Sequence, residues 1–65
     1  MDKRDQILNY LREKGFSAIP QIAKDLGMSR QLVHYHLYRL LDEALVEKVR
    51  LSKGVVIWRA KERRS

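Results

Sequence analysis

Residues 22–33 read IAKDLGMSRQLV, and this stretch predicts two helices joined by a tight turn. Ala23 is small enough for two crossing helices to approach each other closely. Gly27 follows four residues later, where the turn calls for a positive φ that glycine adopts without strain. Ser29 is the expected N-cap of the second helix, and Val33 is placed to pack that helix back against the first.

The sequence on both sides of this pair predicts one more helix and a β-hairpin. Apolar residues at helical spacing and glycines at helix ends define the helices, which we expect at residues 2–14, 19–26 and 29–43. The apolar stripe of the third helix continues as far as Ala44. Two runs rich in β-branched and aromatic residues follow, at residues 46–51 and 55–58 with a turn at 52–54.

This order of elements places the chain in the α+β class, with the arrangement of a winged helix-turn-helix: three helices and then a basic hairpin, or wing. We expect one domain over residues 1–60, with a wing of two or three antiparallel strands. Residues 61–65 contain no large apolar side chain, and we expect them to form a basic, disordered tail.

Length and composition narrow the classes of protein. A chain of 65 residues hides only about 60% of its unfolded surface, which allows one modest core. The absence of cysteine excludes disulfides, iron–sulfur clusters and thiolate zinc sites. No apolar run approaches the roughly 20 residues of a membrane span, and no signal-like segment opens the chain. We therefore expect a protein of the cytoplasm that has no membrane partner.

The charge of the chain indicates a polyanionic partner. Fourteen Lys and Arg against eight Asp and Glu give +6, and residues 44–65 carry +5 of that charge. We expect Lys53, at the tip of the hairpin, and Arg50 and Arg59, on its strands, to reach the phosphate backbone or the minor groove of a nucleic acid. The alternative for Lys53 is a turn that the charge keeps solvated.

The third helix carries the candidate base-reading residues. Its apolar face packs inward, and its polar and aromatic side chains occupy the adjoining face. The candidate contacts on this helix are Ser29, Arg30, Gln31, His34, Tyr35 and Tyr38. Arg30 suits guanine and Gln31 suits adenine in a major groove. We expect His34, Tyr35 and Tyr38 to contact phosphate or to stack. The alternative for the two tyrosines is that their rings pack against the hairpin or the first helix.

The sequence predicts no enzyme, no cofactor and no small-molecule substrate. His34 and His36 point about 200° apart on a helix, so they do not share a metal ion, and His36 is expected to be partly buried. There is no cysteine nucleophile and no glycine-rich phosphate loop. Trp58 is expected in the core beneath the third helix.

Residues 22–31, with the apolar spacing of Val33, Leu37 and Leu40, resemble the helix-turn-helix of bacterial, archaeal and phage winged-helix transcription regulators. Residues 45–49 are similar to the first wing strand of that family, and the resemblance covers residues 4–60. Residues 53–59 are similar to the last strand of the small fimbrial-operon regulators. The resemblance implies a small, nucleoid-associated regulator that binds double-stranded DNA through the third helix and the wing.

A second resemblance is to the Z-alpha domains, winged helices that bind left-handed Z-form DNA or RNA. Arg30, His34, Tyr38 and Trp58 fall at or close to the positions where those domains use Lys, Asn, Tyr and Trp. His34 replaces the Asn, and the apolar residues 55–57 replace the two prolines of the Z-alpha wing. Z-form recognition is therefore the alternative to a regulator of ordinary duplex DNA.

A third alternative is a winged helix that binds only protein, for which an acidic or apolar recognition face is expected. Arg30, Gln31 and His34 give this face neither character. A homodimer is compatible with the sequence, and the surfaces available for pairing are the first helix, the edge strand at residues 55–58 and the DNA itself.

Overall fold

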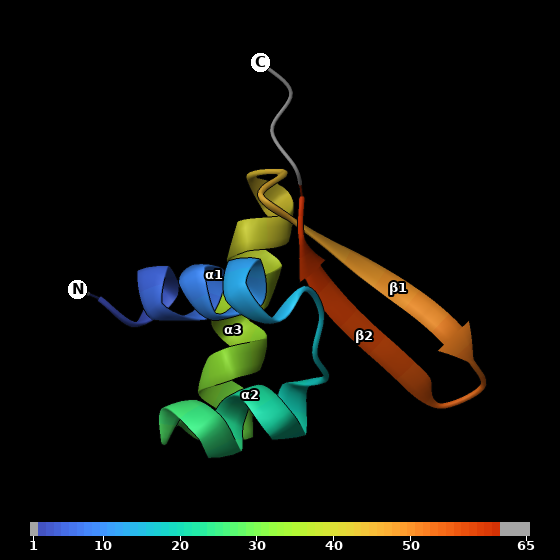
Figure 1. The fold of residues 1–65 in the computed structure, drawn as a ribbon, viewed down its shortest axis with the longest axis horizontal. Helices are drawn as coiled ribbons and strands as arrows, with labels where there is room; N and C mark the ends of the chain where they lie inside the picture. The colour runs from blue at the N-terminus through green and yellow to red at the C-terminus, as the bar shows by residue number, and fades with distance from the viewer. Residues whose placement is uncertain (1, 62–65) are drawn as a thin grey trace.

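The computed structural model of the chain describes residues 2–61 and contains three helices and one hairpin. The elements, in order, are α1 (Lys3–Lys14), α2 (Ile19–Leu26), α3 (Arg30–Asp42), β1 (Val46–Ser52) and β2 (Val55–Ala60). Figure 1 shows α1 lying across α3, α2 beside the start of α3, and the hairpin extending to one side. The winged-helix prediction is confirmed. Of the predicted tail, residues 62–65 lie outside the described part of the chain.

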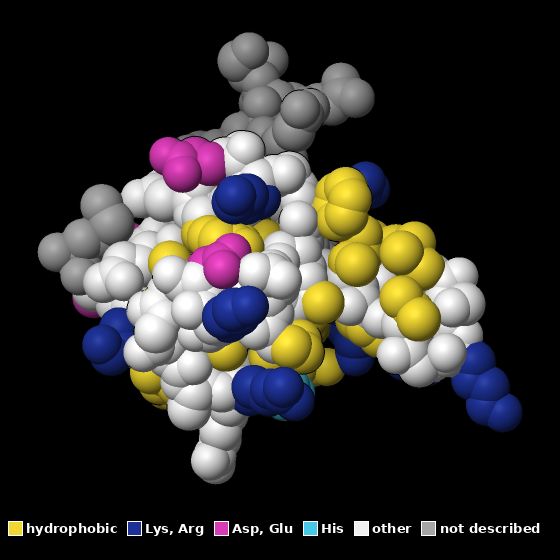
Figure 2. Space-filling view, turned by 60° about the horizontal axis from the view of Figure 1, so that its bottom comes forward, with side chains coloured by type: hydrophobic (Ala, Val, Ile, Leu, Met, Phe, Trp, Pro, Cys, Tyr) yellow, Lys and Arg dark blue, Asp and Glu magenta, His cyan; other side chains and the backbone are white. Residues whose placement is uncertain are grey.

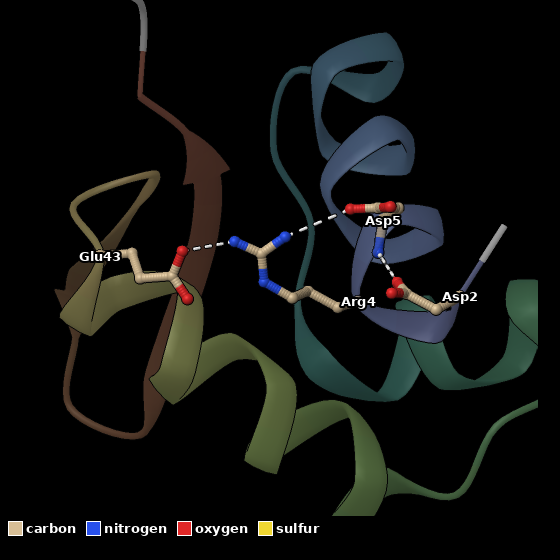
Figure 3. Close-up of polar contacts among 4 residues, drawn as sticks. All are labelled: Asp2, Arg4, Asp5 and Glu43. Atoms are coloured by element: carbon tan, nitrogen blue, oxygen red, sulfur yellow. Dashed lines mark hydrogen bonds and ion pairs between the residues drawn. The ribbon is translucent and has the colours of Figure 1, made fainter.

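A capping residue and an ion pair hold the start of α1. The Asp2 side chain accepts a hydrogen bond from the backbone N–H of Asp5 at 2.9 Å, so the helix begins at Lys3. The Arg4 guanidinium lies between the carboxylates of Asp5, at 3.2 Å, and Glu43 (Figure 3). Because Glu43 directly follows α3, this contact ties the beginning of α1 to the end of α3.

The predicted turn between α2 and α3 forms as expected. Gly27 has a φ of 67° in the left-handed region, and its N–H bonds to the carbonyl of Ala23. The Ser29 hydroxyl accepts from the N–H of Leu32 at 3.1 Å and caps α3. This helix consequently begins at Arg30, one residue later than predicted.

A polar contact braces α2 against α1. The Tyr10 hydroxyl donates to the Asp25 carboxylate at 2.6 Å, and the Gln21 side chain donates to the same carboxylate at 2.9 Å. The Tyr10 hydrogen bond is the main reason that the pKa of Asp25 lies below its usual value. Burial, together with the hydrogen bond to Asp25, raises the pKa of Tyr10.

The end of α3 differs from the sequence prediction. The helix ends at Asp42, and Ala44 is exposed with a φ of 61°, so the apolar stripe does not continue through it. The N–H of Ala44 bonds to the Leu41 carbonyl at 3.0 Å, and the N–H of Leu45 bonds to the Leu40 carbonyl at 2.9 Å. These are the two bonds of a Schellman motif, which reverses the chain so that it can enter β1. Ala44 occupies the position where that motif usually has glycine.

The core joins all three helices to the base of the wing. Its buried side chains are Ile7, Leu8, Leu11, Ile22, Ala23, Val33, Leu37, Leu40, Val46 and Trp58. Trp58 is 1% exposed, which confirms its predicted place in the core. His36 is half-buried, also as predicted. Because β1 and β2 each contribute a core residue, the wing is packed as part of the domain.

The wing is a two-stranded antiparallel sheet whose strands begin where predicted and run further at their C-terminal ends, β1 to Ser52 and β2 to Ala60. Lys48 lies opposite Trp58 and Glu47 lies opposite Arg59, with a register irregularity between Arg50 and Ser52. Directly opposite residues share a face of a sheet and neighbours along a strand alternate. Lys48 is therefore on the face that Trp58 turns toward the core, and Arg59 is on the other face.

The third strand that the sequence allowed is reduced to one bridge. The backbone of Ser17 exchanges hydrogen bonds of 2.9 and 2.8 Å with the backbone of Trp58. These bonds occupy the outer edge of β2 at Trp58. The edge predicted for pairing at residues 55–58 is consequently closed at one end, while β1 has no neighbour on its outer side among the described residues.

Candidate nucleic-acid interface

The first turn of α3 presents free polar side chains. Arg30 and Gln31 are exposed, and neither side chain has a hydrogen bond or ion pair within residues 2–61. Ser29, the third residue predicted here, is exposed but uses its hydroxyl oxygen to cap the helix. The two free side chains can therefore bind an external ligand without breaking a contact within the domain.

An aromatic ladder runs from the exposed face of α3 to the wing. The rings of His34 and Tyr38, one turn apart, have centroids 4.4 Å apart. The rings of Tyr38 and Trp58 meet edge to face, with centroids 5.2 Å apart and an interplanar angle of 70°. Tyr38 is 37% exposed, so its ring both packs on Trp58 and faces solvent. Together with Arg30, one turn before His34, the ladder makes a continuous stripe along α3.

Lys48, at the junction of β1 and α3, is part of this surface, although it was not among the predicted contact residues. Its Nζ donates to the Tyr38 hydroxyl oxygen at 2.6 Å. The same atom lies 5.2 Å from the ring centroid of Tyr38 and 5.9 Å from that of Trp58. Alternation along the strands could have indicated it, because a register that pairs Lys48 with Trp58 places both on the face toward α3.

Tyr35 belongs to a separate part of the α3 surface. It is 53% exposed, and Arg39, four residues later, lies with its guanidinium carbon 5.6 Å from the Tyr35 ring. The Arg39 guanidinium also donates to the Tyr35 hydroxyl at 3.4 Å. This pair, His34 and Tyr38 all line one hollow of about 550 Å³. Arg39 is a second cation that the sequence analysis did not assign to the surface.

The three predicted wing cations lie in different environments. Arg59 donates to Glu47 at 2.7 Å, and this pair occupies the face of the wing that does not carry Lys48. Arg50 and Lys53 are exposed and have no ion pair among residues 2–61. Arg50, two residues beyond Lys48, is on the Lys48 face. The structure therefore groups Arg50 with Lys48 and separates Arg59 from both.

A groove lies between the wing, α3 and the start of α2. It has a volume of about 410 Å³ and is lined by parts of these three elements, including His34, Tyr38, Lys48 and Trp58. Backbone and apolar side chains of the wing tip and of residues 18–20 form its other walls. The aromatic ladder and the Lys48 ammonium thus line a concave surface that is open to solvent.

Hydrophobic side chains also reach the surface outside α3. Phe16 is 61% exposed and Leu51 is 60% exposed, and Figure 2 shows hydrophobic side chains gathered over the wing, with a cation at its far end. Within residues 2–61, no cluster of three or more His, Asp or Glu is arranged to hold a metal ion. None of the helices in that part is long and apolar enough to cross a membrane.

Comparison with known proteins relates the chain to DNA-binding proteins. A family model described as winged helix-turn-helix DNA-binding matches residues 1–47. Over 49 residues, 74% of this chain and 33% of the relative, the chain is 37% identical to an uncharacterized HTH-type transcriptional regulator of Pyrococcus furiosus. The chain thus spans about a third of the length of that curated relative.

Two solved structures of similar fold are complexes with DNA. One is the Zalpha domain from Carassius auratus PKZ in complex with Z-DNA, with a TM-score of 0.80 and 29% identity over 89% of this chain and 90% of that one. The other is Lactococcus lactis ZitR in complex with DNA, with a TM-score of 0.81 and 30% identity over 91% of this chain and 41% of that one. Because the similarity covers 89% and 91% of this chain, it includes the wing as well as the helices.

Proposed function

The chain belongs to the winged helix-turn-helix DNA-binding family, and from this premise we propose that it is a transcription regulator that acts on double-stranded DNA. In this proposal α3 enters the major groove and the wing lies on the adjacent backbone. The observation that carries it is the exposed stripe on α3, which runs from the free Arg30 through His34 and Tyr38 to the wing.

The stripe and the wing have different roles in this proposal. Arg30 and Gln31 read base edges, since a guanidinium and an amide each match one base in the major groove. His34, Tyr35 and Ser29 make supporting contacts along α3. The wing cations Arg50, Lys53 and Arg59 bind backbone phosphates. Arg59 contributes least because Glu47 already neutralises its charge. The proposed place of action is the cytoplasm, at the nucleoid, because that is where a regulator meets its DNA.

The experiment is selection of bound duplexes from a random pool, followed by fluorescence anisotropy at low salt. We expect enrichment of a short motif and tighter binding to it than to a scrambled duplex. Binding to no duplex at low salt would exclude the proposal. Equal binding to all duplexes would exclude the base-reading role of α3 and leave a nonspecific DNA-binding domain.

Z-form recognition is a second candidate function, favoured by the edge contact between Tyr38 and Trp58 and by the likeness to a Z-DNA complex. The departures at His34 and at residues 55–57 rank it below the first. Circular dichroism of an alternating CG duplex decides between the two. An inversion of the spectrum on addition of the protein supports Z-form binding, and an unchanged right-handed spectrum excludes it.

We further propose that two copies occupy one operator, because a single α3 covers only a short site. The exposed Phe16 and Leu51 and the open edge of β1 support pairing outside the DNA-facing stripe. Sedimentation velocity of the free protein and of its complex with the selected duplex tests this. A complex that contains one copy per duplex at saturation would contradict it.

A further inference from the structure

We propose that Lys48 and Tyr38 together form a binding subsite for one backbone phosphate, at the junction between α3 and the wing. The inference rests on the proposed function, namely that this face of the domain binds a nucleic acid. It goes further because it assigns a phosphate ligand to Tyr38 and Lys48, and Lys48 was not among the predicted contact residues. Three features of the junction support it: an unneutralised cation, an available hydroxyl proton and the packed aromatic rings that position both groups.

The Lys48 ammonium has no anionic partner in the described part of the chain. No carboxylate within residues 2–61 forms an ion pair with it, whereas Arg4 pairs with two carboxylates and Arg59 with one. Its partners are the Tyr38 hydroxyl oxygen and the faces of the Tyr38 and Trp58 rings. An ammonium has three N–H donors, and the Tyr38 bond uses one of them. The junction thus holds a full positive charge with donors left for an external anion.

The Tyr38 hydroxyl supplies a second donor at the same place. Its oxygen accepts from Lys48 at 2.6 Å, so its own proton is free to be donated elsewhere. The neighbouring charge polarises the hydroxyl and strengthens that donation, most of all toward a charged acceptor. Two donors from different elements therefore converge on one site, and the non-bridging oxygens of a phosphate can accept from both.

The subsite is held in place before the ligand arrives. Trp58 is 1% exposed and supports the Tyr38 ring, and the exposed Lys48 side chain lies against both rings and bonds to the Tyr38 hydroxyl. A lysine on an open turn, such as Lys53, must lose side-chain freedom when it binds a phosphate. At Lys48 the contacts with the two rings and the Tyr38 hydroxyl reduce that cost. Because the subsite spans α3 and β1, one phosphate bound there also fixes the wing relative to the helix in the groove.

The test compares Lys48→Met, Tyr38→Phe and the double variant by fluorescence anisotropy on the selected duplex, over a range of salt. Methionine keeps an apolar stem against the rings and removes the charge. We expect Lys48→Met to weaken binding about fivefold near 0.15 M salt and to lower the salt slope by about 0.9. Tyr38→Phe should weaken binding about three- to tenfold with the slope unchanged. The double variant should lose less than the product of the two.

A matched control is available on α1. Lys14 lies 6.0 Å from the ring centroid of Tyr10, a similar pairing of lysine and tyrosine that is placed away from the α3 stripe. Lys14→Met should leave both affinity and salt slope nearly unchanged. Thermal unfolding of all variants separates lost contacts from lost folding. A Lys48→Met variant that loses affinity with an unchanged salt slope would show a structural role only and would overturn the subsite.

A neutral methylphosphonate, moved one position at a time along the duplex, locates the phosphate. At one position we expect the modification to weaken the native protein but to have little further effect on Lys48→Met. The absence of any such position would overturn the inference. If Lys48→Met binds like the native protein while Arg30→Ala loses affinity, the subsite is wrong and the proposed function stands. If the native protein binds no duplex, the proposed function itself is wrong.

Discussion

The α3 helix and the wing face the same proposed ligand but distribute charge differently. Residues 30–43, which are α3 and its C-cap Glu43, contain two Arg against one Asp and one Glu and are formally neutral, whereas residues 44–65, the wing together with the tail, carry +5. In the first turn of α3, Arg30 and Gln31 have no partner within residues 2–61, and their polar groups have a defined geometry. On the wing, Lys53 is a point charge on a flexible stem and Arg50 is a second exposed cation, and both can bind any backbone phosphate. The comparison separates selection of a sequence from attraction to a duplex.

The two regions are nonetheless one structural unit. Trp58 from β2 is buried in the core that the helices share, and its ring packs against Tyr38 on α3. The wing therefore cannot move freely while α3 stays in place. Because of this connection, nonspecific phosphate binding by the wing also limits the positions in which α3 can meet the bases.

The largest expected effect comes from breaking that connection. Trp58→Ala removes the largest buried side chain and should lower the free energy of unfolding by about 3–5 kcal/mol, enough to unfold a domain of this size. Urea denaturation followed by far-UV circular dichroism measures it. Ile57→Ala, which alters the half-buried neighbour on the other face, should cost distinctly less. Equal losses would mean that the wing does not depend on Trp58 for its packing.

Arg30→Ala should remove sequence discrimination. Loss of a bidentate contact to a base costs about 1–3 kcal/mol on the preferred duplex, and binding to a scrambled duplex should fall much less. Anisotropy titrations on both duplexes give the ratio. The comparison between α3 and the wing fails if Arg30→Ala weakens the two duplexes by the same factor.

Lys53→Ala should have the opposite signature. We expect all duplexes to be weakened alike, about fivefold near 0.15 M salt, with the salt slope lowered by about one unit. Arg59→Ala is the matched variant, because its charge is already paired with Glu47 and should change the slope less. A larger slope change for Arg59 than for Lys53 would show that the Glu47 pair opens on binding.

Local chemistry explains how much of the fold could be predicted. The turn and the helices depend on interactions between residues close together in the sequence, such as the Gly27 turn and the Ser29 cap. The spacing of these residues and of the apolar stripe was therefore enough to predict them. Trp58 was predicted in the core because a large ring in a short domain has few other places to go. The single bridge at Ser17 was not specified, since it depends on where the loop after α1 passes β2.

The polar part of the candidate site was harder to predict. The contact between Lys48 and Tyr38 joins residues on different elements and depends on the angle of the wing to α3. The pairing of Arg59 with Glu47 depends on the hairpin register, which a strand pattern leaves open by one or two residues. Ala44 was misplaced because alanine fits a helical stripe well, and only the reversal into β1 forces it into the left-handed region.

Ala44→Gly sharpens the comparison at the junction itself. An L-residue in the left-handed conformation costs about 1 kcal/mol or more, and glycine removes that cost at the expense of a more flexible unfolded chain. We expect a net rise in stability of about 0.5–1 kcal/mol, measured by urea denaturation, with the affinity for DNA unchanged. A fall in stability would mean that the turn tolerates alanine without strain.

The smallest expected effect concerns the hydrogen bond between Tyr10 on α1 and Asp25 on α2. The Tyr10 hydrogen bond lowers the pKa of Asp25 in the folded state below its unfolded value of about 3.9. A lowered pKa stabilises the fold fully above the unfolded value, and this contribution is lost as pH falls through the folded value. Tyr10→Phe removes the hydroxyl and should cost a small amount of stability at pH 7. The difference from the native protein should shrink below about pH 4, as measured by urea denaturation across pH. A difference that stays constant down to pH 2 would assign the effect of Tyr10 to its hydroxyl packing and not to the charge of Asp25.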